Sequence, residues 1–310
     1  MAAFIGQLKA CLEARVPVFV DIKDVEELEL NAITVLLAVM VQFTSRGIKF
    51  NGNIPLRLEV LQRLKESRFF EHLNAQAESL APRRRRQLED SGFFHHLNRS
   101  NQQRESYDFP GSSIYTHGKL FVDSEFSQQL IDEATKTIWG EHRRCPGVQR
   151  TFIELMQNTN NHASLHKNGE EHWWISLQHL KEENKVVFCF VDFGIGVFES
   201  LARKPESNIF YKAIDKLKQL FGVTRNEQVL KLIFDGELHK TVTGYYYRGK
   251  GLPGIYNVQQ KKHISKLSMI TNDVYFTSAD NQYRRLKTGF SGTFISWELS
   301  RQNDSLPNEN

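Results

Sequence analysis

Residues 185–196 read KVVFCFVDFGIG, and they join an apolar run to a short polar turn. The run is rich in β-branched and aromatic side chains, which predicts a strand buried on both faces. Asp192 follows the run, and Gly194 and Gly196 come next. Glycines there let the backbone pass close to a flat ring, while the carboxylate accepts a hydrogen bond from an exocyclic amine. The stretch therefore predicts a base-binding strand end, although Asp-x-Gly-x-Gly alone is also typical of a tight turn.

The preceding segment predicts two helices and another strand. Residues 124–139 (SEFSQQLIDEATKTIW) have helical periodicity, with Ser124 as the expected N-cap. A second helix is predicted from Pro146 to about residue 164. Residues 173–180 (WWISLQHL) predict a strand that leads into the one quoted above.

Polar side chains recur at helical spacing in the second of these helices. Glu154, Asn158 and Asn161 are four and then three residues apart, which places them on one helical face. An asparagine oxygen can coordinate Mg²⁺, and a nearby carboxylate can orient or deprotonate a nucleophile. The apolar residues that point elsewhere are expected to bury against a sheet: Phe152, Leu155 and Met156. Spacing alone is equally typical of the solvent-exposed side of an amphipathic helix.

Two glycine motifs follow downstream. Residues 248–254 read RGKGLPG and lead into a helix expected to begin near Leu252. Glycines ahead of a helix N-terminus expose amide N–H groups that suit triphosphate oxygens, and Lys250 or Arg248 would add charge. Residues 291–297 (SGTFISW) predict a glycine-threonine pair that opens a buried strand.

Taken in order, these motifs resemble the ATP-binding domain of the GHKL superfamily, which includes gyrase, MutL, histidine kinases and anti-sigma-factor kinases. The N box would be Glu154–Asn158, the two glycine boxes Asp192–Gly196 and Gly249–Gly254, and the terminal pair Gly292-Thr293. The resemblance implies a Bergerat α/β (α+β) sandwich over residues 114–300, with helices on one face of a mixed sheet. His162-Ala163 also resembles the anti-sigma-kinase form of the N box, although His162 is equally compatible with a packing role.

The resemblance also implies a role for each matching position. Glu154 would be the general base, Asn158 would hold Mg²⁺, and Asp192 would recognise the adenine amine with help from Thr293. The residues implied to contact ATP or Mg²⁺ are Asn158, Asn161, Asp192, Gly194, Gly196, Gly249, Lys250, Gly251, Leu252, Gly254 and Thr293. Between the glycine boxes, residues 197–248 predict a lid with helices near 210–221 and 226–234, able to close over ATP.

The N-terminal half predicts strand–helix–strand–helix, from residues 16–21, 28–43, 48–51 and 56–73. The last helix would bury Leu58, Leu61, Leu64 and Phe69 on one face. This pattern resembles a STAS domain, the small fold of anti-sigma-factor antagonists. The phosphorylated turn of those antagonists corresponds to residues 29–32, ELNA, which carry no hydroxyl, so a constitutive docking or scaffold role is expected. Thr34 is the only hydroxyl between residues 25 and 40.

A chain of 310 residues favours two domains with separate cores. We expect a STAS-like domain over residues 1–75, a polar linker over 76–113, the ATP-binding domain over 114–300 and a disordered tail over 301–310. Within the linker, Arg83–Arg86 is typical of a solvated charged face. The alternative is phosphate binding to nucleic acid or lipid, helped by the nearby residues 93–96, FFHH.

Composition excludes several other classes. The net charge of +4 is too small to argue by itself for nucleic acid or an anionic membrane. Three cysteines without metal-like spacing suggest neither a disulfide framework nor a zinc site, and Cys189 is expected to be buried in its strand. The longest apolar run, residues 32–43, is too short to span a bilayer, and no signal peptide is recognisable at the N-terminus, so a cytoplasmic protein is expected.

Three functions fit these patterns. The first is an Mg-ATP-dependent ATPase that acts as a conformational switch in an intracellular regulatory or assembly system. The second is a serine/threonine protein kinase similar to anti-sigma kinases, acting on a separate protein. The third is a non-catalytic adaptor that binds ATP for structure. Protein partners are expected at the STAS-like domain or the lid, and a homodimer is expected by analogy with both families.

Overall fold

A computed structural model gives the fold, and it describes residues 2–67, 69–70, 115–119, 122–162, 173–202, 217–237 and 251–303. The predictions made for the linker, including Arg83–Arg86 and residues 93–96, lie outside these residues. The domain boundaries around the linker stay predictions for the same reason.

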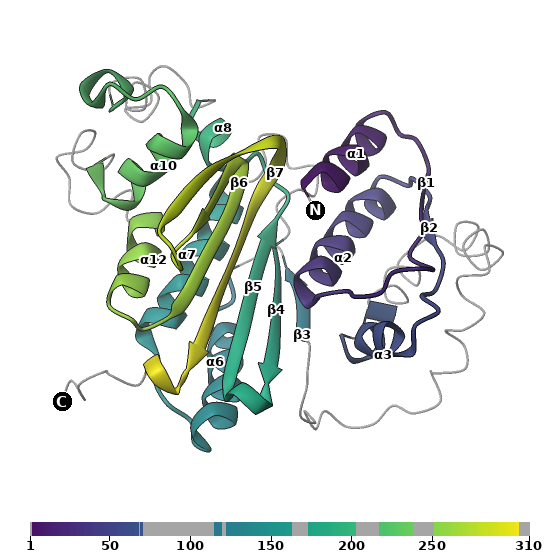
Figure 1. Cartoon of the computed structure of the whole chain (residues 1–310), viewed down its shortest axis with the longest axis horizontal. Helices are drawn as coiled ribbons and strands as arrows, with labels where there is room; N and C mark the ends of the chain where they lie inside the picture. The colour runs from purple at the N-terminus through teal and green to yellow at the C-terminus, as the bar shows by residue number, and fades with distance from the viewer. Residues whose placement is uncertain are drawn as a thin grey trace.

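The centre of the molecule is a five-stranded sheet with strand order β3-β4-β5-β7-β6 (Figure 1). Every neighbouring pair in it is antiparallel. Its strands are β3 (Tyr115–Lys119), β4 (Trp173–Leu180), β5 (Lys185–Asp192), β6 (Ser265–Thr277) and β7 (Gln282–Ser300). The strands predicted at 173–180 and 185–191 are therefore confirmed, and the glycine-threonine pair lies inside the long strand β7 rather than at its start.

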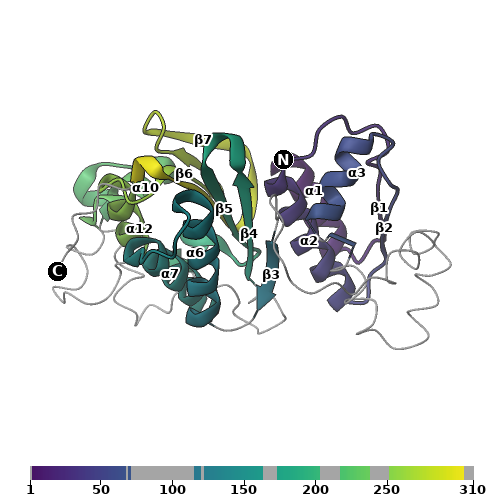
Figure 2. The same cartoon turned by 90° about the horizontal axis from the view of Figure 1, so that it is seen from below.

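One face of this sheet is covered by α6 (Ser124–Trp139), α7 (Pro146–His162) and α12 (Gly251–Gln260), as Figure 2 shows. The helix predicted at residues 124–139 has those bounds, but its N-cap is Asp123 rather than Ser124. The Asp123 side chain accepts a hydrogen bond from Phe126 N at 2.8 Å, which satisfies a free amide of the first turn.

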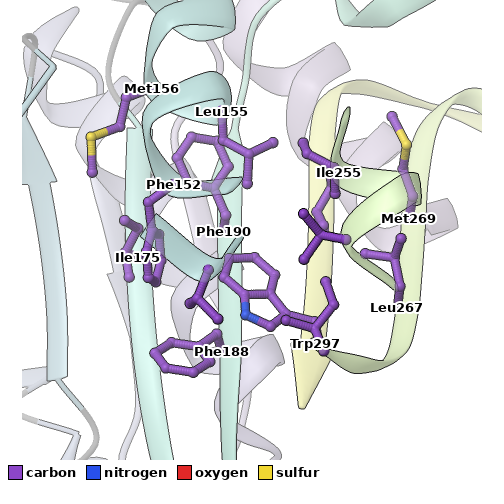
Figure 3. Packing of buried hydrophobic residues seen from close by; sticks show 14 of the residues in the cluster. Phe152, Leu155, Met156, Ile175, Phe188, Phe190, Ile255, Leu267, Met269 and Trp297 are labelled. Atoms are coloured by element: carbon purple, nitrogen blue, oxygen red, sulfur yellow. The ribbon is translucent and has the colours of Figure 1, made fainter. Parts of the chain in front are cut away.

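Aromatic side chains fill the space between these helices and the sheet (Figure 3). Trp297 stacks on Phe188 with ring centroids 5.4 Å apart, and Phe152 of α7 meets Trp297 edge-on at 5.1 Å. Leu155 and Met156 are also buried here, as their positions on α7 predicted. This packing fixes α7 on the sheet and so determines where its polar side chains lie.

The opposite face is covered by α1 (Ala2–Glu13) and α2 (Leu30–Ser45), visible on the other side of the sheet in Figure 2. A second apolar core joins these helices to sheet residues that include Trp174, Cys189 and Val191. Helices therefore lie on both faces of the sheet, those of the C-terminal part on one face and those of the N-terminal half on the other. The expectation of two separate cores is corrected, because the N-terminal half shares its core with the sheet. Between its charged end residues, strand β5 is apolar from Val186 to Val191 because both of its faces are covered.

The N-terminal segment has the predicted element order, preceded by α1, which sequence patterns did not predict. Strands β1 (Val18–Val20) and β2 (Phe50–Gly52) pair in parallel across α2, and α3 (Leu58–Glu66) follows. The parallel β1–β2 pair and the antiparallel five-stranded sheet agree with a mixed α/β (α+β) class, but the single mixed sheet expected within residues 114–300 is wrong, because all of its described strand pairs are antiparallel. Leu64 of α3 is fully buried, but Leu58 is 76% exposed, so its predicted place in the core is wrong. The resemblance to a STAS domain stays a prediction.

The chain remains ordered past β7. Residues Arg301–Asn303 form a 3₁₀ turn, and the buried Asn303 donates from Nδ2 to the Lys262 carbonyl at 2.8 Å. The predicted disordered tail therefore cannot begin at residue 301, because Asn303 ties the end of β7 to the segment after α12. None of the helices within the described part of the chain is both long and apolar enough to cross a membrane.

Candidate functional site

Helix α7 presents Glu154 and Asn158 on the side that faces α12. A Cβ atom built on Gly251, the first residue of α12, would lie 3.1 Å from Asn158 Nδ2 and 3.3 Å from Glu154 Oε2. Contacts that close are tighter than most Cβ contacts, so glycine lets the start of α12 approach both side chains without displacing them. The sequence placed these three residues in one site, and the structure brings them together.

Arg150 adds a positive charge beside this pair. Its Nε lies 3.8 Å from Glu154 Oε1, one helical turn away, and its guanidinium also borders Gly254 of α12. The Arg150 side chain is 52% exposed, so the ion pair contributes little to stability, and both side chains stay available to a ligand. Sequence patterns did not single out Arg150, although it precedes Glu154 by four residues.

Asp192 ends β5 between two other strands. It pairs with Trp173 of β4 on one side and Thr293 of β7 on the other, and its side chain is buried. Asp192 Oδ1 accepts from the Gly194 amide at 2.9 Å, and Thr293 also hydrogen-bonds the carboxyl. The structure thus brings together Asp192, Gly194 and Thr293, which the sequence assigned to one end of the pocket.

Burial makes the ionised form of the Asp192 carboxyl less favourable than it would be in water. Burial raises its pKa from the ordinary 3.8 to about 6, against the lowering effect of hydrogen bonds from Gly194, Thr293 and Thr159. The group is therefore mostly ionised at neutral pH despite its burial. A buried, ionised carboxylate is suited to accept a hydrogen bond from a ligand N–H donor.

Thr159 connects the two groups of residues. It follows Asn158 on α7 and is 2% exposed. Its hydroxyl donates to Leu155 O at 3.1 Å and also lies close enough to the Asp192 carboxyl to lower the pKa of that group. The last turns of α7 therefore contact both the strand end at Asp192 and the start of α12. Sequence patterns missed Thr159, and the one signal was its place next to Asn158.

The turn after Asp192 is held from β6. Gly196 has φ +76°, and a Cβ there would lie 2.5 Å from Asn272 Oδ1. Gly292 of β7 has φ +111°, and a Cβ there would collide with the Asp192 carbonyl. Both glycines are thus required by close approach as well as by backbone conformation. Thr271 and Asn272 were not predicted, although polar residues inside a buried strand are a usable signal.

A cavity of about 270 Å³ lies behind this turn, on the side of α1 and α2. Phe193, Gly194 and Ile195 form one wall, and Lys9 of α1 bonds the Ser291 hydroxyl of β7 at another. The cavity is separate from the side where Thr159 meets Asp192. It shows that the same turn borders both the candidate site and the N-terminal helices.

Several predicted site residues lie outside the described part of the chain. Gly249 and Lys250 precede the first described residue of α12, and only the backbone of Asn161 and His162 is described. In the predicted lid, α10 (Asn226–Phe234) is confirmed, and residues 217–221 are helical within the helix expected at 210–221. Leu252 is partly buried against the core beneath α12.

Among the described residues, no three His, Cys, Asp or Glu side chains are grouped as a metal site. The arrangement can bind a ring amine at Asp192, anionic oxygens at the start of α12, and a nucleophile near Glu154. Comparison of the chain with protein-family models, curated proteins and solved structures finds no match.

Proposed function

We propose that the chain binds Mg-ATP between α7, α12 and the end of β5, and that it hydrolyses ATP as a nucleotide-dependent switch. One observation carries the proposal: the last turns of α7 contact Asp192 through Thr159 and the start of α12 through Glu154 and Asn158. A single helix, α7, would thus lie beside both the base and the phosphates of the nucleotide. The proposal agrees with the GHKL resemblance, which was based on motif order alone.

Asp192 would recognise the adenine. An ionised carboxylate accepts from the exocyclic amine of adenine, whereas the carbonyl at the same position of guanine would meet a second acceptor. The Gly194 amide already occupies Asp192 Oδ1, and this bond orients the carboxylate. Thr293, hydrogen-bonded to the same carboxyl, lies where it can assist at that edge of the base.

The phosphates would lie at the N-terminus of α12. This helix spans ten residues, and its first amides, at Gly251 and Leu252, carry the positive end of the helix dipole. Arg150, beside Gly254, adds direct charge. Asn158 Oδ1 lies at the same place and fits a hard cation, so it would hold Mg²⁺, which when bound neutralises charge on the phosphate oxygens.

Glu154 would act as the general base. Its carboxylate is 23% exposed, so water can reach it, and it lies beside the start of α12 where the terminal phosphate would be. Glu154 would take a proton from the attacking water as the water oxygen bonds to the terminal phosphorus and ADP departs with the electron pair. The products are ADP and inorganic phosphate.

The N-terminal half would respond to the nucleotide state of the site. Phe193 belongs to the core that α1 and α2 share with the sheet, so a ligand-dependent change at the turn after Asp192 is transmitted to these helices. Thr34, the hydroxyl nearest the phosphorylated turn of STAS antagonists, is fully buried and hydrogen-bonded to Leu30 O and Ser176 Oγ. The observation favours a switch or docking role over self-phosphorylation of this segment.

Turnover of labelled ATP tests the proposal. Wild type, Glu154→Gln and Asp192→Asn are compared for nucleotide binding, free phosphate and protein-bound label. Glu154→Gln is expected to lower the hydrolysis rate about 10²–10⁴-fold, the usual effect of losing a general base, while ATP stays bound. Asp192→Asn is expected to weaken binding about 10–100-fold, because a charge-assisted hydrogen bond is lost.

Glu182→Gln, in the exposed 3₁₀ turn between β4 and β5, is the matched control and should leave turnover unchanged. Unaltered hydrolysis in Glu154→Gln would reject the catalytic assignment. Binding without turnover in wild type would favour a protein kinase that needs a separate partner, or an adaptor. The absence of ATP binding in wild type would reject the proposal as a whole.

A further inference from the structure

A polar cluster on β6 holds the turn that follows Asp192. Thr271 and Asn272 lie where the register between β6 and β7 shifts, since Thr271 pairs with Thr293 but Asn272 pairs with Phe290. Asn272 has φ +48°, in the left-handed region that few residues other than glycine and asparagine adopt readily. The bulge breaks an otherwise regular strand and turns the Asn272 side chain toward the turn.

Four hydrogen bonds join this bulge to neighbouring segments. Asn272 Nδ2 donates to Ile195 O at 2.8 Å, and Asn272 Oδ1 accepts from Phe198 N at 3.0 Å. The Val197 amide donates to Thr271 Oγ1 at 3.0 Å. The Thr271 hydroxyl donates in turn to Gly292 O at 3.1 Å, beside Thr293.

These bonds fix the turn on both sides of Gly196. Ile195 lies before the glycine, and Val197 and Phe198 belong to the first turn of α8 (Gly196–Ala202), so the cluster also satisfies free amides at the start of that helix. Gly196 has no Cβ, which lets Asn272 approach its backbone. One amide group thus satisfies a free carbonyl and a free amide with its own donor and acceptor.

We propose that Asn272 is a positioning residue for the nucleotide, and that it acts by holding the Gly194–Gly196 turn at the distance from Asp192 that the adenine ring requires. This role rests on the proposed ATP site. Asn272 does not contact the reacting atoms, and Thr271 supports it from the adjacent position. Pocket residues alone would not reveal this contribution, because Asn272 lies on a different strand and acts through the backbone.

We call the two Asn272 side-chain hydrogen bonds, to Ile195 O and from Phe198 N, the clamp. Two variants separate the effect of the clamp from a general effect on folding. Asn272→Gly and Asn272→Ala both remove the side-chain bonds, but only alanine is strained at positive φ, so the two should differ in stability. If Asn272 positions the turn, both variants weaken ATP binding by about the same factor, about 10-fold. An ATP affinity that instead falls in proportion to stability would overturn the proposal.

Asn281→Gly is the matched control. Asn281 is exposed, has φ +52°, and lies in the turn between β6 and β7, away from Gly196. It therefore reproduces the backbone change of Asn272→Gly without removing the clamp. Neither ATP affinity nor the exchange of amides in the turn should change in this variant.

Amide hydrogen exchange of the protein without nucleotide makes the test independent of ATP binding. Asn272→Gly is expected to speed exchange at Gly194, Val197 and Phe198 by about 10-fold or more, while amides in the core of β5 stay protected. Unchanged exchange at these amides would refute the clamp, whatever ATP does. Faster exchange with unaltered ATP affinity in the variant would refute the positioning role. Failure of wild type to bind ATP would remove the proposed function, and with it this role.

Discussion

Helices cover both faces of the five-stranded sheet: α6, α7 and α12 cover the front face, and α1 and α2 cover the rear face. The buried polar groups on the two faces differ in how fully they are hydrogen-bonded. Behind the sheet, the Thr34 hydroxyl of α2 bonds both Leu30 O and the Ser176 hydroxyl of β4, and both residues are fully buried. In front, the Asp192 carboxyl is also buried, but its pKa is raised because its hydrogen bonds only partly offset burial. The rear face therefore satisfies its polar groups, whereas the front face retains a costly charge.

This difference agrees with the proposal that the face with α7 and α12 binds a ligand, whereas the face with α1 and α2 joins two parts of the chain. A buried polar group that is fully hydrogen-bonded costs little and specifies how two surfaces meet. A buried carboxylate with incomplete compensation destabilises the fold until a ligand donates to it. Mutations on each face test this difference separately.

The largest expected effect is on the rear face. Leu37 of α2 is 1% exposed and lies one turn from Thr34, so Leu37→Ala should lower the free energy of unfolding by about 2–5 kcal/mol. Because the core is shared, the whole described fold should lose stability in a single denaturation transition, followed by circular dichroism and tryptophan fluorescence. Leu58→Ala, at a position 76% exposed, is the matched control and should change stability by less than about 0.5 kcal/mol. Separate transitions for the two halves would show that the N-terminal helices are an independent unit.

The next effect concerns Asp192 and pH. The folded chain binds the Asp192 proton more tightly than the unfolded chain, so this group's contribution to stability falls as pH rises from 3.8 towards 6. Asp192→Asn removes that loss. Relative to wild type, the variant should therefore gain about 2.5 kcal/mol of stability between about pH 4 and pH 7.5, measured by urea unfolding. Asp280→Asn, in the exposed turn after β6, controls for the loss of one negative charge. An equal stability difference at both pH values would contradict the buried, costly carboxylate.

The smallest effect tests the polar pair behind the sheet. Thr34→Val and Ser176→Ala, alone and together, form a double-mutant cycle. Each single variant leaves one buried hydroxyl with fewer partners, and the coupling between them should be about 1 kcal/mol, measured by chemical denaturation. Coupling near zero would mean that the hydrogen bond does not help to join α2 to β4.

Local patterns predicted most of the elements. The period of residues 124–139 and the apolar runs at 173–180 and 185–191 gave a helix and two strands because periodicity and β-branched content are properties of short segments. The spacing of Glu154 and Asn158 also predicted that they would share a helical face. Two predictions that depend on a single position were wrong. Asp123 rather than Ser124 caps α6, and Leu58 is exposed at the start of α3 rather than buried.

The sequence by itself determined strands β4 and β5, the polar face of α7, and the order of glycine motifs that led to the ATP-binding prediction, whereas β3 and β6 were not predicted. Only the tertiary structure decided that α1 and α2 cover the rear of the sheet, and that Thr159, Thr271 and Asn272 bond to the site. The physical reason is the range of the interactions. Helical and strand periodicity is encoded within a few residues, whereas a hydrogen bond between Asn272 and Ile195 depends on the sheet that brings distant segments together.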